Sequence, residues 1–126
     1  MTAARPRVLV VEDEQPLREL IVVTLSEEFD CDEAADGEAA LERLRAARPE
    51  LVVLDSMLPG RSGIDVLREM RADPTLRDVP VLMLSAWQSS EDVDGAMDAG
   101  ADSFLGKPFR VEELVGVAHE LAERPR

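Results

Sequence analysis

Short runs of apolar residues alternate along the chain with segments whose apolar residues recur at the spacing of a helix. Three runs, residues 8–11, 51–54 and 81–84, are wholly apolar, which is typical of strands covered on both faces. Two weaker runs, residues 31–34 and 103–105, contain polar residues, and the first has the composition of a strand at a sheet edge. The pattern therefore predicts five strands.

The segments between these runs predict helices, because apolar residues three and four positions apart form one stripe in each. The predicted stripes contain Leu17, Leu20, Ile21, Thr24 and Leu25; Ala40, Leu41 and Leu44; Ile64, Leu67 and Met70; Val93, Ala96 and Met97; and Leu114, Val115, Ala118 and Leu121. Ser62 and Asp65 have the spacing of a capping box, and Gly100 is placed to end the fourth helix. Strict alternation of strands and helices predicts a doubly wound α/β fold, in which helices cover both faces of a parallel sheet.

Composition and charge narrow the classes of function. A length of 126 residues suits a single domain, residues 1–126. The net charge of −13 argues against direct binding to nucleic acid or to an anionic membrane surface. No apolar run approaches the roughly 20 residues of a membrane-spanning helix, and no signal peptide is visible. The single cysteine, Cys31, fits a reducing compartment, so we expect a cytoplasmic protein.

Chemically active side chains follow four of the predicted strands. Glu12 and Asp13 come after the first strand, Asp55 ends the third, Ser85 ends the fourth, and Lys107 follows the fifth. The carboxyl ends of the strands of an open parallel sheet border the same crevice. We therefore expect these side chains to share one site.

The predicted site has the composition of a phosphoryl-transfer centre. Clustered carboxylates repel one another and need a cation, and oxygen ligands without a histidine or cysteine cluster suit Mg²⁺. Mg²⁺, Lys107 and Ser85 around Asp55 would let this carboxylate act as a nucleophile toward phosphorus. Each group alone has an ordinary explanation: acidic residues in a first helical turn, a turn cap, a polar strand end and a solvated lysine. Their coincidence at the ends of four strands favours the functional interpretation.

Four blocks of sequence carry a resemblance to a known family. "VLVVEDE", "PELVVLDSMLPGRSGIDVLREMR", "VPVLMLSA" and "GADSFLGKPF" resemble, in order and spacing, the blocks of CheY-like receiver domains of two-component response regulators. The resemblance extends from about Arg7 to Leu121. It implies a flavodoxin-like, five-stranded parallel sheet in the order 2-1-3-4-5, flanked by five helices. It also implies a phosphorylation-activated switch that catalyses only its own phosphorylation and dephosphorylation.

The resemblance assigns the phosphoryl acceptor and the metal ligands. Asp55 would accept the phosphoryl group from the phosphohistidine of a histidine kinase or of a histidine phosphotransfer protein. Mg²⁺, or Mn²⁺ in its place, would be held by Glu12, Asp13, Asp55 and the backbone carbonyl of Met57.

The resemblance also assigns the switch residues. Ser85 would turn toward the phosphoryl group, Phe104 would then rotate inward, and Lys107 would pair with the phosphoryl group, with a cis peptide bond to the following proline. Ala86 and Trp87 stand where the family tunes autodephosphorylation. Our hypothesis is that the indole of Trp87 shields the acyl phosphate from water.

The predicted fourth helix lies in an acidic stretch. Between Asp78 and Gly106 there is no lysine or arginine, so this face is either a solvated exterior or a docking surface for a basic partner. Gly95 inside the helix costs about 1 kcal/mol relative to alanine, which makes this helix a plausible movable element. The output could pass to a separate effector protein or to a fused domain. The dimer that winged-helix members form through this region uses basic residues that are missing here, so it is not expected.

Two other functions compete with the switch. A phosphatase of the haloacid dehalogenase type also uses an aspartate at a strand end, but has a second aspartate two residues later, where this chain has Met57. An interaction module that is never phosphorylated would have no need of the complete set of site residues.

Overall fold

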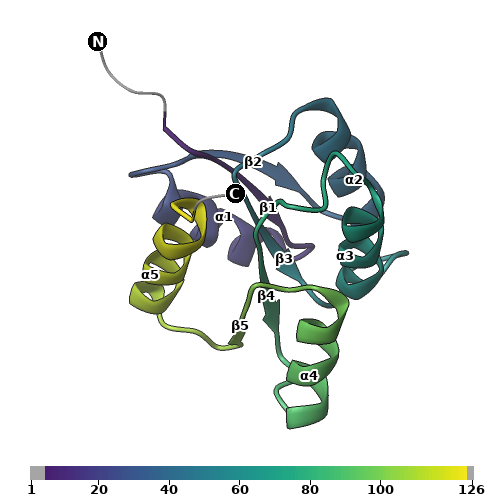
Figure 1. Ribbon diagram of the computed structural model, residues 1–126. Coiled ribbons are helices and arrows are strands. Elements are labelled where there is room, and N and C mark those ends of the chain that lie inside the picture. Colours follow the sequence, from purple (N-terminus) through teal and green to yellow (C-terminus); the bar gives the residue numbers. More distant parts are fainter. Residues whose placement is uncertain (1–4, 125–126) are drawn as a thin grey trace.

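The computed structural model describes residues 5–124, in which strands and helices alternate strictly (Figure 1). The strands are β1 (Arg7–Val11), β2 (Asp30–Ala34), β3 (Leu51–Asp55), β4 (Val81–Ser85) and β5 (Ser103–Gly106). The helices are α1 (Gln15–Leu25), α2 (Gly37–Ala46), α3 (Gly63–Ala72), α4 (Ser90–Ala99) and α5 (Val111–Ala122). None of the helices within residues 5–124 combines the length and the apolar character needed to cross a membrane.

The strands form one parallel sheet in the order β2-β1-β3-β4-β5, which confirms the predicted fold. The central strands β3 and β4 are wholly buried, whereas residues of the edge strands β2 and β5 are partly exposed. Asp55 pairs with Leu84 and Ser85 with Gly106. This register brings the carboxyl ends of the strands that carry the site residues to one edge of the sheet.

The helices divide between the two faces of the sheet, with α1 and α5 on one face and α2, α3 and α4 on the other (Figure 1). Successive strand residues point to opposite faces and feed two separate cores. Val53 packs with the α1–α5 side, and Leu54 packs with the α2–α3 side. Coverage of both faces explains why the central strands are apolar at every position.

The predicted helical stripes are mostly correct, but two of their residues are exposed. Leu20 is 49% exposed and Met97 is 43% exposed. Helix α1 instead buries Ile21 and Leu25, and α4 buries Ala96 alone. Periodicity marks the centre of a stripe better than its width, because the helix surface turns away from the sheet on both sides of the contact line.

The helix ends follow local side-chain chemistry. The hydroxyl of Ser62 accepts a hydrogen bond from the N–H of Asp65 at 3.1 Å and so caps α3, which is one of the two bonds of the predicted capping box. A complete reciprocal capping box begins α4, between Ser89 and Asp92, and sequence analysis had missed it. Gly100 ends α4 with φ of +113°, a conformation that favours glycine.

Candidate functional site

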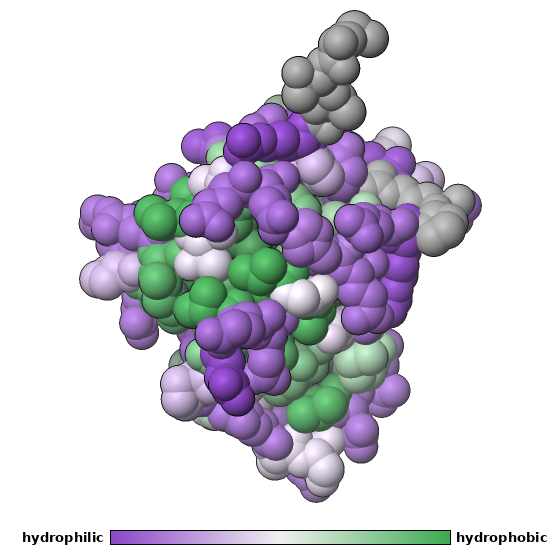
Figure 2. All heavy atoms as spheres, turned by 90° about the vertical axis from the view of Figure 1, so that its left-hand side faces the viewer, coloured by the Kyte–Doolittle hydropathy of each residue, from purple (hydrophilic) through white to green (hydrophobic). Residues whose placement is uncertain are grey.

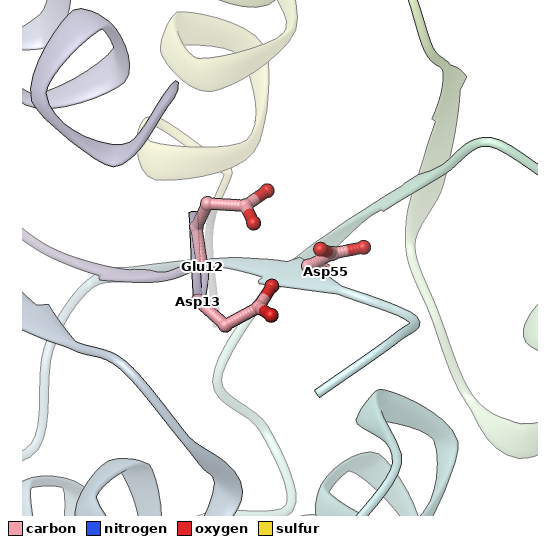
Figure 3. Close-up of side chains that lie close together, drawn as sticks. All are labelled: Glu12, Asp13 and Asp55. Atoms are coloured by element: carbon pink, nitrogen blue, oxygen red, sulfur yellow. The ribbon is translucent and has the colours of Figure 1, made fainter. Parts of the chain in front are cut away.

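Three carboxylates converge at the carboxyl edge of the sheet (Figure 3). Glu12 and Asp13 follow β1, and Asp55 is the last residue of β3. One oxygen of each lies within 4.8 Å of the others. Glu12 is fully buried and Asp55 is 3% exposed, while Asp13 is exposed to solvent. Such a group of oxygens can hold a metal ion, and without a cation its charges repel one another.

Lys107 lies among these acids. Its Nζ donates to Glu12 Oε1 at 2.8 Å and to Asp55 Oδ2 at 2.9 Å. The backbone N–H of Lys107 donates to the carbonyl of Ser85 at 2.8 Å, which ties the loop after β5 to the end of β4. The peptide bond to Pro108 is cis, as the resemblance implies. The sheet thus brings Lys107 to Asp55 from a position 52 residues away.

Burial and charge act on these groups in opposite directions. Burial raises the pKa of Glu12 from its usual 4.5 to about 7, although hydrogen bonds from Lys107 and from the N–H of Glu14 oppose the rise. Burial by itself would lower the pKa of Lys107, but its hydrogen bonds to Glu12 and Asp55 raise that pKa above its ordinary value. Lys107 is therefore a permanent positive charge in the site, and a second cation would favour the ionised form of Glu12.

Further contacts orient the acids. The N–H of Met57 donates to Asp55 Oδ1 at 3.2 Å, while the side chain of Met57 is 48% exposed. Arg18 donates to the carbonyl oxygen of Glu12 at 2.9 Å and pairs with Glu33 at 3.0 Å. Sequence analysis missed Arg18, because one of its partners is a backbone atom and the other is on β2.

Ser85 is buried, and the partners of its hydroxyl are Ser56 and Trp87. It is 2% exposed, and its Oγ accepts hydrogen bonds from Ser56 Oγ at 2.7 Å and from the N–H of Trp87 at 3.0 Å. Ser85 lines a hollow of about 200 Å³ together with Phe104 of β5 and with residues of β4 and α4. Ser56 was not among the predicted site residues, and only its position directly after Asp55 could have indicated it.

Trp87 stands between this hollow and a second one. It lines the hollow that Ser85 borders and also a groove of about 380 Å³ that Asp13 and Met57 border. Its side chain is 57% exposed, and Ala86 before it is exposed as well. The indole therefore borders a groove that Asp13 also borders, and it is in contact with solvent.

An apolar groove of about 390 Å³ lies on the other side of Lys107. It is lined by Leu17, Leu20, Lys107, Pro108, Phe109 and Val111. Figure 2 views the side of the molecule that carries α1 and α5, and it shows hydrophobic residues gathered in one region with hydrophilic residues around it. The groove thus offers an apolar surface that reaches the site through Lys107.

The acidic residues near α4 divide into two groups. Asp92 belongs to the capping box of α4, and Asp102 accepts hydrogen bonds from Arg71 and from the N–H of Val81. These two acids therefore have structural roles. Three others, Glu91, Asp94 and Asp98, are exposed and form the acidic surface of the helix.

Comparisons with known proteins show which family and which structures this chain is similar to. The family model described as the response regulator receiver domain matches residues 8–119. The chain is 45% identical over 116 residues to the DNA-binding response regulator MtrA of Mycobacterium tuberculosis, covering 91% of this chain and 50% of that protein. It is 42% identical over 110 residues to the phosphate regulon transcriptional regulatory protein PhoB of Escherichia coli, covering 86% of this chain and 48% of that protein. The chain thus spans about half the length of both relatives.

Solved structures share the whole architecture. The receiver domain of a Francisella response regulator superposes with a TM-score of 0.91 at 31% identity, covering 97% of this chain and 100% of that one. The chemotaxis response regulator CheY4 of Vibrio cholerae gives a TM-score of 0.88 at 28% identity, covering 94% of this chain and 99% of that one.

Proposed function

This chain belongs to the response regulator receiver domain family, and we propose that phosphorylation of Asp55 is the event that switches it. Members of this family are phosphorylation-activated switches of two-component systems, so the role of the chain is signalling and not metabolism. We extend this role to residues 1–126 as one receiver domain. The observation that carries the proposal is the hydrogen bond from Lys107 to Asp55 at 2.9 Å, beside two further carboxylates.

The proposed step is a displacement at phosphorus. An oxygen of Asp55 attacks the phosphorus of a phosphohistidine, the new P–O bond forms, and the electron pair of the broken P–N bond returns to the imidazole ring. Lys107 already lies against this carboxylate, so it can stay paired with the oxygens of the transferred group. Ser85 then turns to donate a hydrogen bond to the same oxygens, and Phe104 occupies the space that Ser85 leaves.

The metal of this site would be Mg²⁺, or Mn²⁺ in its place. Glu12, Asp13, Asp55 and the carbonyl of Met57 would hold it, because an all-oxygen set suits these hard cations. When bound, the ion supplies positive charge to the phosphoryl oxygens.

Trp87, the single tryptophan of the chain, provides a test of metal binding, because it lines the same groove as Asp13. Addition of Mg²⁺ is expected to change its fluorescence. Asp13→Asn should weaken this binding at least about tenfold, which corresponds to 1.4 kcal/mol. Asp94→Asn, an exposed acid on α4, is the matched control and should bind like the wild type. Binding of Mg²⁺ that is unaffected by Asp13→Asn would place the metal elsewhere.

Acetyl phosphate with Mg²⁺ separates the three candidate functions. A receiver takes one phosphoryl group on Asp55, which mass spectrometry of the intact chain and its peptides locates, and Asp55→Asn stays unlabelled. A phosphatase of the haloacid dehalogenase type would turn over many phosphomonoesters, and Met57 in place of its general acid argues against it. An unphosphorylated interaction module would take no label, and that result would overturn the proposal.

The phosphohistidine donor must dock beside Asp55, and we assign the apolar groove between α1 and the start of α5 to it. Lys107 lines this groove and contacts Asp55, so an apolar helix face bound there would bring its histidine to the site. Leu20→Ser should slow transfer from a phosphorylated histidine kinase at least about tenfold, since it removes apolar contact area, and leave labelling by acetyl phosphate unchanged. Val23→Ser, on the same helix at 70% exposure, is the control. Equal effects of both variants would contradict the assignment.

Trp87 would prolong the life of the acyl phosphate. Its indole borders the groove that reaches Asp13, so it limits the approach of water from that side. Trp87→Ala should shorten the decay of a radiolabelled phosphoryl group on Asp55, while Trp87→Phe, which keeps an aromatic ring, should shorten it less. An unchanged lifetime in Trp87→Ala would remove Trp87 from the mechanism. Ala86 before it is exposed and carries only a methyl group.

Output would pass through the surface of α4, β5 and α5 to an effector protein or a fused domain. Glu91, Asp94 and Asp98 are exposed there, which suits a basic partner. The net charge of −13 disfavours direct contact of this chain with nucleic acid. We place this exchange in the cytoplasm, because histidine kinases form phosphohistidine from ATP there.

A further inference from the structure

Two hydroxyl groups meet at the ends of β3 and β4. Ser56 Oγ donates to Ser85 Oγ at 2.7 Å across a sequence separation of 29 residues. The contact follows from the register, because Asp55 pairs with Leu84 and the N–H of Ser56 donates to the carbonyl of Leu84 at 2.9 Å. Ser56 is thus held by the backbone directly after the phosphoryl acceptor.

The two hydroxyls differ in burial and in the space they border. Ser85 is 2% exposed, whereas Ser56 is partly exposed. Ser85 borders the hollow that contains Phe104 and Ala96, while Ser56 borders both that hollow and the groove of Asp13. The hydrogen bond from Ser56 therefore holds Ser85 beside the hollow under α4, together with the bond from the N–H of Trp87.

We propose that Ser56 is a positioning residue that holds Ser85 in its unphosphorylated orientation and releases it when Asp55 carries a phosphoryl group. This inference rests on the proposed function, in which Ser85 turns toward the phosphoryl oxygens. Those oxygens would replace the contact with Ser56, so the Ser56–Ser85 bond stabilises the unphosphorylated state alone. The bond sets the threshold of the switch.

The difference in burial makes release feasible. When Ser85 turns away, the Ser56 hydroxyl remains open to water through the groove, so no polar group is stranded. Ser85 is buried and needs a new partner, which the phosphoryl group supplies. Deletion of the Ser56 hydroxyl should therefore favour the active orientation, because the resting orientation loses a neutral hydrogen bond and the active one loses nothing of comparable strength.

Beryllofluoride, a phosphoryl analogue that binds to aspartate, measures the balance without a turnover step. In the presence of Mg²⁺, Ser56→Ala should bind beryllofluoride about three- to tenfold more tightly than the wild type, the range expected from the loss of one hydrogen bond. Ser56→Thr keeps the hydroxyl and should bind within about twofold of the wild type. Trp87 fluorescence or calorimetry gives the dissociation constants.

Two controls separate a positioning role of Ser56 from a general loss of stability. Ser62→Ala removes another hydroxyl that borders the same two hollows but is bonded to the N–H of Asp65, so it should lower stability and leave beryllofluoride affinity unchanged. In a Ser85→Ala background, the additional Ser56→Ala change should have no effect, because the partner is already absent.

The outcomes distinguish this inference from the function on which it rests. If the wild type binds beryllofluoride and takes label on Asp55 while Ser56→Ala binds equally or more weakly, the positioning role is overturned and the proposed function stands. An effect of Ser56→Ala that persists in Ser85→Ala also overturns it. If the wild type neither binds beryllofluoride nor takes label, both proposals fail together.

Discussion

Helices α3 and α4 contain ten residues each and lie on the same face of the sheet, but they are held very differently. Four residues of α3 are buried, Gly63, Val66, Leu67 and Met70, whereas α4 buries Ala96 alone. The same layer architecture therefore contains one helix that is part of the core and another that rests on its edge. Low burial is what a movable element requires.

The two helices also differ in where they are attached. The N-terminus of α3 is joined to the residue that follows β3, since the N–H of Gly63 donates to the carbonyl of Ser56 at 2.9 Å. Helix α4 is held at its C-terminus, where Arg71 donates to the carbonyl of Gly100 at 2.8 and 3.0 Å, and its Ala96 borders the hollow that contains Ser85 and Phe104. Helix α3 is thus tied to the end of β3, whereas α4 is tied to Arg71 at its C-terminal end.

The largest expected effect comes from the packed helix. Leu67→Ala should lower the free energy of unfolding by about 3 kcal/mol, because Leu67 is fully buried and the change leaves a cavity. Met97→Ala on α4 should lower it by less than about 1 kcal/mol, since that side chain is 43% exposed. Urea unfolding of both variants measures the difference. Equal losses would mean that α4 is as tightly packed as α3.

A smaller loss of stability is expected where α3 meets the end of β3. A Cβ on Gly63 would lie 2.1 Å from the carbonyl oxygen of Asp55 and 2.8 Å from Cα of Ser56. Gly63→Ala must therefore displace backbone, which should destabilise the chain by about 1–3 kcal/mol and slow the labelling of Asp55 by acetyl phosphate. Thermal unfolding and labelling rates test this together. A variant with normal stability and normal labelling would show that the end of β3 tolerates movement.

The buried Glu12 of the site and the exposed Asp94 of α4 should respond differently to pH. In the absence of Mg²⁺, the folded chain holds the proton of Glu12 more tightly than the unfolded chain does, because burial raises the pKa of Glu12 from 4.5 to about 7. Stability should then fall as pH rises through this interval, by roughly 1–3 kcal/mol. Glu12→Gln should remove this part of the pH dependence, whereas Asp94→Asn on the exposed face of α4 should leave it intact. Urea midpoints at several pH values measure it, and the same slope in Glu12→Gln would exclude Glu12 as the source.

The smallest expected effect concerns α4 itself. A Cβ on Gly95 would meet nothing within 4 Å, so Gly95→Ala should stabilise the chain by about 0.5–1 kcal/mol through helix propensity. Hydrogen exchange should show that the α4 amides of the wild type respond to beryllofluoride while those of α3 do not, and that Gly95→Ala reduces the response. Identical protection with and without beryllofluoride would count against movement of α4.

Several features of α4 and the site depended on contacts that no local pattern reports. Asp102 lies in the acidic stretch between Asp78 and Gly106, yet it accepts hydrogen bonds from Arg71 of α3 and from the backbone of β4. Met97 and Leu20 fit helical periodicity but are exposed. Such differences arise because periodicity reports which side of a helix is apolar, and the neighbouring elements set how much of that side is covered.

The chain alone was enough to predict the order of strands and helices along the sequence and the apolar cores. It was also enough to predict that Glu12, Asp13, Asp55 and Lys107 gather at one edge of the sheet. The first two follow from local periodicity, and the last follows from the rule that parallel strands end at a common edge. The sequence could not predict the hydrogen bond between Ser56 and Ser85 or the one from Arg18 to the carbonyl of Glu12. It also could not predict that α4 buries so little of its surface. They depend on strand register, side-chain orientation and the fit of distant surfaces, which exist only once segments far apart in the chain have packed together.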